Sequence, residues 1–116
     1  MSTPTRATIR PRAVAADETR RRLDFPAINR AALCDLPVLL GRWLPDGRVS
    51  GHEYDARNPR RPDRNVGSFR INLRTCKWAD FATGDKGGDP ISLAAFLFGV
   101  SQREAARRLA TLLGVR

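Results

Sequence analysis

A regular alternation of apolar and polar residues over 68–73 is the feature that most constrains the fold of this chain. Phe69, Ile71 and Leu73 fall on one side of an extended strand, whereas Arg70 falls on the other. A period of two residues is typical of a strand with one buried face and one face in water. The sequence therefore predicts a sheet that buries one side and turns basic side chains outward.

Turn residues around this strand indicate a small antiparallel sheet. A short turn leads into a second strand over 77–81, so residues 68–81 are predicted to form a hairpin. Upstream, residues 48–57 are predicted to form one further strand. Residues 58–67 contain two prolines and three arginines and are predicted to be an exposed basic loop, and the glycine-rich segment 83–88 is predicted to be a flexible loop.

Helix signals lie on both sides of the sheet in the sequence. Residues 26–44 are predicted to be helical, with Pro26 in the first turn and a break near Pro37. After the sheet, Asp89 is a predicted N-cap that precedes a proline at the first helical position. The helix over 91–98 is apolar on nearly every side, which predicts that it is buried.

A last helix begins after Ser101, which is predicted to form a capping box with Glu104. Four of its apolar residues are predicted to face inward: Ala105, Leu109, Leu112 and Leu113. These elements predict an α+β fold with N-terminal helices, a small antiparallel sheet and two C-terminal helices. Residues 1–22 lack an apolar period and are predicted to be a disordered basic arm, so 23–116 is predicted to be a single domain.

Charge points to the class of partner. The chain has 116 residues and a formal net charge of +9, and 19 of its 21 basic residues are Arg. A strongly positive surface attracts polyanions, and the Arg guanidinium matches phosphate geometry, so nucleic acid is the leading predicted partner. A GC-rich genome would also raise the Arg content. No apolar stretch has the length of a membrane helix and no secretory signal is visible, which predicts a cytoplasmic protein without a membrane partner.

The basic residues gather in one part of the sequence. Seven basic and two acidic residues lie between positions 55 and 77. We predict that this segment contacts nucleic-acid phosphates; the alternative is a solvated strand face and loop. The predicted contact residues are Arg57, Arg60, Arg61, Arg64, Arg70, Arg74 and Lys77.

Two further candidates have a structural alternative. Trp78 is predicted either to stack on an unpaired base or to belong to the core. Lys86 lies in a glycine-rich segment ahead of a helix N-terminus, which either holds a phosphate or is a tight turn that needs glycine. Paired carboxylates for metal catalysis, drawn from Asp80, Asp85 and Asp89, are rejected because Asp89 is better explained as an N-cap.

An ordered set of features between Gly67 and Val115 resembles a known family. Ser68-Phe69 opens a strand, a hairpin follows, a Gly-Gly-Asp turn leads into an apolar helix, and a final helix carries the Ala- and Arg-rich segment 104–110. This order resembles the zinc-ribbon DNA-recognition domain of bacterial and phage DNA primases. The segment 78–89 looks like the variant found in primase-helicase proteins of plasmids, prophages and integrative elements. The resemblance implies a module that helps a primase choose where to start on its template.

The metal ligands of that family are missing. By the family's spacing the ligands would fall at Phe81 and Gly84 and near Pro59 and Pro62, and none of these side chains binds zinc. The remaining candidates are scattered and one ligand short: Cys34, His52 and Cys76. We therefore expect no metal or other cofactor, and a fold held by apolar packing against the helix 91–98. The residues expected in that core are Phe69, Ile71, Leu73, Trp78 and Phe81.

The sequence therefore predicts a non-catalytic module that binds nucleic acid, with single-stranded DNA as the expected ligand and RNA left open. It would serve a replication or primase system of a mobile element. Expected protein partners are a primase, a helicase or a polymerase subunit. The alternative is an adaptor that docks on such a protein without binding DNA itself.

Overall fold

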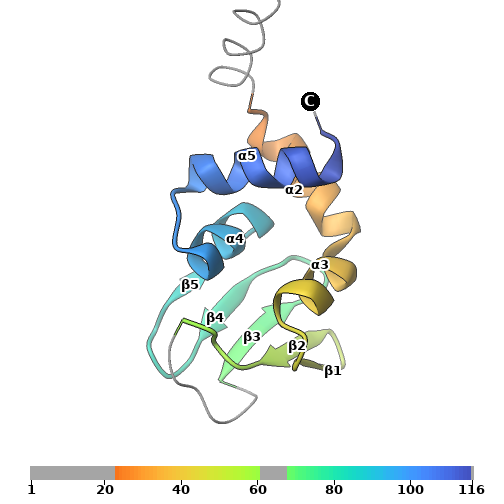
Figure 1. Ribbon diagram of the computed structural model, residues 1–116. Coiled ribbons are helices and arrows are strands. Elements are labelled where there is room, and N and C mark those ends of the chain that lie inside the picture. Colours follow the sequence, from red (N-terminus) through yellow and green to blue (C-terminus); the bar gives the residue numbers. More distant parts are fainter. Residues whose placement is uncertain (1–22, 61–67, 116) are drawn as a thin grey trace, which may run out of the picture.

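The computed structural model describes residues 23–60 and 68–115, and within them helices lie on one side of a five-stranded antiparallel sheet (Figure 1). The predicted α+β class is confirmed. The predicted arm 1–22 and loop residues 61–67 lie outside the described residues. The helices are α2 (Phe25–Cys34), α3 (Leu36–Trp43), α4 (Pro90–Phe98) and α5 (Gln102–Leu113). The strands are β1 (Arg48–Ser50), β2 (Glu53–Ala56), β3 (Phe69–Asn72), β4 (Trp78–Asp80) and β5 (Lys86–Gly87).

The strands follow one another across the sheet in the order β1-β2-β3-β4-β5, each antiparallel to the next. The predicted hairpin of β3 and β4 is confirmed. The prediction of a single strand over 48–57 is wrong, because the chain turns at Gly51-His52 and sets Arg48 opposite Asp55. The prediction of a loop over 83–88 is wrong for β5, in which Lys86 pairs with Ala79 of β4.

One face of the sheet contributes buried side chains to the hydrophobic core. Phe69, Ile71 and Trp78 are buried there, as predicted, together with Tyr54. Side chains of α3 and α4 cover them, among them Leu36, Leu40 and Leu93. Phe81 was expected in this core, and that prediction is wrong because 69% of the residue is exposed. Trp78 and Phe81 are an odd number of positions apart, so the alternation of a strand places them on opposite faces.

Helix α4 is the middle layer of the fold. Leu93 packs toward the sheet, whereas Ile91 and Ala94 pack against α2 and α5. Contact on both sides explains why this helix is apolar nearly all round. The predicted N-cap is confirmed, since Asp89 Oδ1 accepts the Ser92 N–H at 2.8 Å and Ser92 Oγ lies 3.3 Å from the Asp89 amide nitrogen. Gly99 ends the helix at φ 66°, a left-handed conformation that favours glycine.

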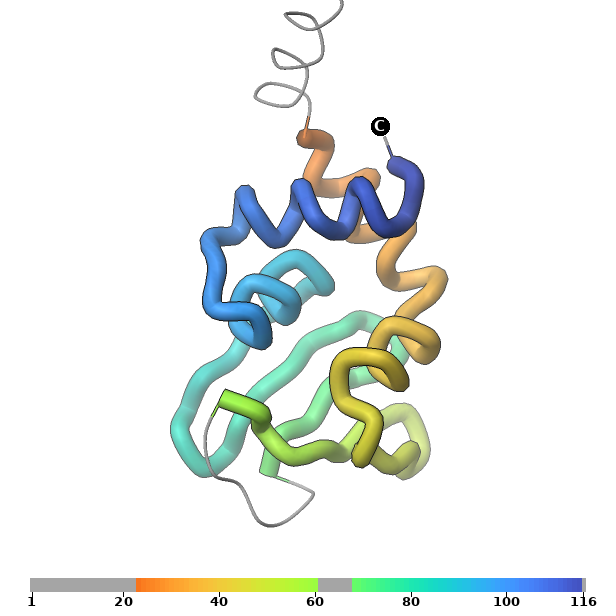
Figure 2. The backbone as a smooth tube through the Cα atoms, in the orientation of Figure 1, coloured from red at the N-terminus to blue at the C-terminus, as the bar shows by residue number. Residues whose placement is uncertain are grey.

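Helix α5 closes the fold. Figure 2 shows that it lies beside α2, although the two helices come from opposite ends of the described chain. Ala105 and Leu109 are buried as predicted, and Ala106 joins them. The prediction for Leu112 is wrong, because this side chain is exposed. No helix in the two described ranges is both long enough and apolar enough to cross a membrane.

Candidate nucleic-acid interface

The face of the sheet turned away from the helices carries most of the predicted contact residues that the structure describes. The strand register aligns one row of side chains across it: Arg48, Asp55, Arg70, Ala79 and Lys86. Lys77 also lies there, because it precedes the buried Trp78, and its carbonyl accepts the Asn72 N–H at 2.8 Å. We call this surface the outer face.

Arg57 extends the outer face past the end of β2. It is exposed between Ala56 and Asn58, which are both buried, so strand alternation turns it outward. The outer face thereby gains a fifth basic side chain beside Arg48, Arg70, Lys77 and Lys86. Its acidic members are Glu53 and Asp55, so positive charge prevails.

Arg70 is the most constrained of these cations. Its Nε lies 3.4 Å from Asp55 Oδ1 on the neighbouring strand. Its guanidinium carbon lies 5.8 Å from the centre of the Phe81 ring, within the range of a cation–π contact. About half of the Arg70 side chain remains exposed. The guanidinium is therefore held in position while still accessible from solvent.

Arg60 lies apart from the other predicted contact residues, against the end of α4. Its Nη1 donates to the Phe96 carbonyl at 3.3 Å, and its guanidinium carbon lies 5.9 Å from the Phe96 ring centre. Phe96 belongs to the last turn of α4, where free carbonyls favour a cation. Arg60 therefore supports the end of α4 and does not join the outer face.

Of the remaining predicted arginines the structure describes one, Arg74. Arg74 is exposed in the turn between β3 and β4, where its N–H donates to Asn72 Oδ1 at 2.8 Å. Arg61 and Arg64 lie outside the described residues. The structure thus brings together four of the predicted cations: Arg57, Arg70, Lys77 and Lys86.

Trp78 is a core residue and offers no ring to a base. Only 5% of it is exposed, and its Nε1–H donates to Ser92 Oγ at 3.0 Å. Its ring packs edge-on against Phe69 and at a tilt against Phe96. The core alternative therefore describes this residue, and base stacking by Trp78 is not available in this fold.

The N-terminus of α4 has little left to offer a phosphate. The Ile91 N–H donates to Asn29 Oδ1 at 3.0 Å, and the Ser92 N–H is taken by Asp89. Position 90 is a proline and has no N–H. Lys86 belongs to β5, where it pairs with Ala79 and its side chain lies on the outer face. The amides of the first turn of α4 are therefore not free to hold a phosphate, as one of the two alternatives for this segment required.

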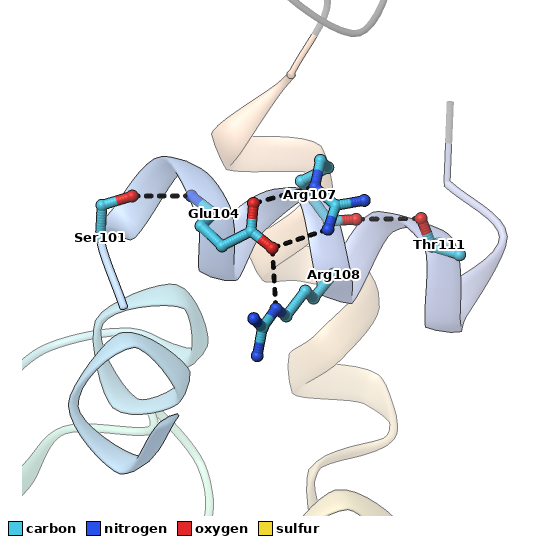
Figure 3. A network of polar contacts seen from close by, with 5 residues as sticks. All are labelled: Ser101, Glu104, Arg107, Arg108 and Thr111. Atoms are coloured by element: carbon cyan, nitrogen blue, oxygen red, sulfur yellow. Dashed lines mark hydrogen bonds and ion pairs between the residues drawn. The ribbon is translucent and has the colours of Figure 1, made fainter. Parts of the chain in front are cut away.

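Helix α5 carries a second group of arginines, shown in Figure 3. Glu104 binds Arg107 through two hydrogen bonds of 2.9 and 2.6 Å and Arg108 through one of 2.8 Å. Hydrogen bonds from Arg107 and Arg108 lower the pKa of Glu104 to about 2. Ser101 and Glu104 were predicted to form a capping box. Only one of its two hydrogen bonds is present, from the Glu104 N–H to Ser101 Oγ at 3.0 Å. Glu104 thus compensates one of the three positive charges of α5, which come from Arg103, Arg107 and Arg108.

The possible metal ligands of the chain do not converge. In the described ranges no three His, Cys, Asp or Glu side chains are close enough together to hold a metal ion. Cys76 is buried in the sheet core and Cys34 is exposed on α2. Burial raises the pKa of the Cys76 thiol to about 12, with a further contribution from Asp89, so this sulfur stays protonated at neutral pH.

Sequence reasoning missed two members of the outer face, Arg48 and Phe81. A single strand over 48–57 would place Arg48 on the same face as Tyr54, so Arg48 was not predicted to join the outer face. Gly51 was the sequence signal for a turn and therefore for a hairpin. Phe81 was predicted to lie in the core together with Trp78. The two residues are three positions apart, so strand alternation already showed that they cannot both point to the buried face. No family model and no curated protein matches the chain.

Proposed function

We propose that this protein is a non-catalytic module that binds single-stranded DNA through the outer face of its sheet. It would act in the cytoplasm within a replication or primase system of a mobile element, as its resemblance to primase zinc-ribbon domains suggests. Metal-free packing replaces the zinc site of that family. The related partners would be a primase, a helicase or a polymerase subunit.

A single observation carries this proposal: five basic side chains gather on the face of the sheet that the described helices leave uncovered. They are Arg48, Arg57, Arg70, Lys77 and Lys86. Adjacent strands are about 4.8 Å apart, so these charges are spaced over a surface that a phosphate backbone can follow. Lys and Arg on such a surface neutralise phosphates and release counterions, which gives affinity with little sequence preference.

The experiment is a salt titration of binding to an oligo(dT) strand. For single strands the slope of log K against log salt is about −0.7 for each phosphate contacted. The triple variant R57A/K77A/K86A removes three exposed cations and should reduce the slope by about 2 and weaken binding at low salt. These three residues are chosen because the pair of Arg70 and Asp55 stays intact in the variant.

The matched control is Arg42→Ala. Arg42 is an exposed arginine of α3, which covers the opposite side of the sheet. Its removal lowers the net charge but should leave the salt slope unchanged. Equal losses in R42A and in each single variant of the triple would show that only net charge matters, and salt-independent or absent binding would refute the proposal.

A second candidate, the adaptor, is favoured by the edge of the sheet. Among the described strands, β1 pairs only with β2, so its other edge is open, and Val49 on it is exposed. An exposed edge of this kind can accept a strand from a partner protein. A Val49→Lys change should abolish capture of a primase or helicase partner if the adaptor function is correct, and should leave oligo(dT) binding unchanged.

A further inference from the structure

We propose that Phe81 and Arg70 form a stacking site for one unpaired base on the outer face. This inference rests on the proposed function, and it goes further because charge alone binds single and double strands alike. It also assigns base stacking to Phe81 instead of Trp78, because Trp78 is buried and Phe81 is exposed.

Phe81 is the most exposed of the large apolar side chains in the described parts of the chain. Its backbone is nevertheless fixed, since its N–H donates to the Ser68 carbonyl at 2.8 Å and extends the pairing of β3 with β4. The preceding residue, Asp80, is fully buried, so the Phe81 ring projects from the outer face. The ring thus has a defined position and a largely open surface.

Packing does not account for this exposure. A phenylalanine left in water forgoes the stabilisation that burial of its ring would bring to the fold. An aromatic face on an open sheet is, in contrast, what an unpaired base can use, because every base has a π face. Arg70 adds a planar guanidinium beside the ring, with its guanidinium carbon 5.8 Å from the ring centre. The pair is therefore arranged before a ligand arrives.

The surroundings suit a nucleotide on either side of the stacked base. Ala79 lies between Arg70 and Lys86 in the strand register. Because its side chain is small, it leaves space for a base beside Phe81. Lys86 is two strands from Arg70, about 10 Å away at ordinary strand spacing. Arg57 lies beyond the end of β2, on the other side of Arg70. Cations thus flank the ring where the phosphates of a single strand would pass.

The test compares two strands of equal length, oligo(dT) and an abasic strand, which carry the same phosphates. The wild-type protein should bind oligo(dT) at least about five-fold more tightly than the abasic strand, since one stacked base contributes at least that factor. Phe81→Tyr should keep this preference. Phe81→Leu should lose it, because leucine is apolar but has no π face, while its affinity for the abasic strand and its salt slope stay unchanged.

Val49→Ala serves as the control, because it removes an exposed apolar side chain outside the outer face. Since the Phe81 ring is mostly in water, F81L should unfold at the wild-type temperature. Salt-dependent binding of both strands with no difference between wild type and F81L would overturn the stacking site and leave the proposed function standing. That outcome is also expected if the ring serves a protein partner. Failure to bind either strand would overturn both proposals.

Discussion

The indole Nε1–H of Trp78 donates to Oγ of Ser92 at 3.0 Å and ties the middle of the sheet to the first turn of α4. Gly87 of β5 lies against this pair. A Cβ at position 87 would come within 2.5 Å of Ser92 Oγ and even closer to Trp78 Nε1. The glycine is therefore required by the close approach of two side chains. The backbone angles at position 87 make no such demand.

Gly87→Ala should destabilise the protein by about 1–3 kcal/mol, because the added methyl group must displace the indole or break its hydrogen bond. Urea unfolding monitored by circular dichroism measures the change. Gly88→Ala is the matched control, since nothing lies within 4 Å of a Cβ there. Equal stability of the two variants would contradict the proposed role of the Trp78–Ser92 contact.

Asn58 and Asp80 predict a second stability effect. Asn58 Nδ2 donates to Asp80 Oδ2 at 2.7 Å, and both residues are buried. Asn58→Ala removes a donor from a buried carboxylate and should cost about 1–3 kcal/mol. Arg57→Ala, at the exposed neighbouring position, should change the unfolding free energy by less than about 0.5 kcal/mol. If the two variants are equally stable, the contact does not anchor this segment.

The two cysteines should differ in reactivity. Burial raises the pKa of Cys76 to about 12, whereas Cys34 is exposed. The thiolate is the reactive form, so at pH 8 a disulfide reagent should modify Cys34 in the native protein and Cys76 only after unfolding. Titration of the thiols with the disulfide reagent, with and without guanidinium, measures how many react in the native and in the unfolded protein. Cys34→Ser should abolish the native reaction, and rapid modification of both thiols in the native state would contradict the burial of Cys76.

Local sequence patterns predicted the helices and strands well, but they predicted poorly which side chains contact one another in the fold. The alternation of Phe69 and Ile71 and the Asp89 N-cap depend on neighbours in the sequence, and both predictions are confirmed. The role of Arg60 could not be predicted, because its partner Phe96 lies far along the chain. Likewise, Glu104 satisfies the sequence rule for a capping box but binds two arginines of its own helix. A charge pattern shows where cations occur, but only the fold shows which of them are already engaged.

Glu104 predicts a pH dependence. Its pKa is about 2 in the folded protein, below its ordinary value near 4.5. A lowered pKa means that the ion pairs stabilise the fold above the ordinary value and that this stabilisation is lost as the pH falls toward 2. Wild type should therefore unfold at a higher temperature than Glu104→Gln at pH 7, with the difference closing between pH 4.5 and 2. High salt should reduce the difference, because the group is exposed. A difference that persists at pH 2 would argue against the ion pairs as its source.

Asp55 should oppose nucleic-acid binding, since its carboxylate competes with phosphate for Arg70. Oδ1 of Asp55 is buried, accepts no hydrogen bond and lies 3.4 Å from Arg70 Nε. A charge pair at this distance is worth about 1 kcal/mol in a water-like medium, so Asp55→Asn should tighten oligo(dT) binding about five-fold at low salt. The gain should shrink as salt rises.

Glu104→Gln gives the matched control for this change. It raises the net charge by the same amount, but on α5 and away from the outer face. Binding isotherms of both variants on oligo(dT) should show tightening for D55N alone, because local competition for Arg70 differs from a general increase in charge. Equal tightening in both would mean that net charge attracts the strand and that the outer face is not its site. Unchanged affinity in D55N would show that the Asp55 carboxylate does not compete with phosphate for Arg70.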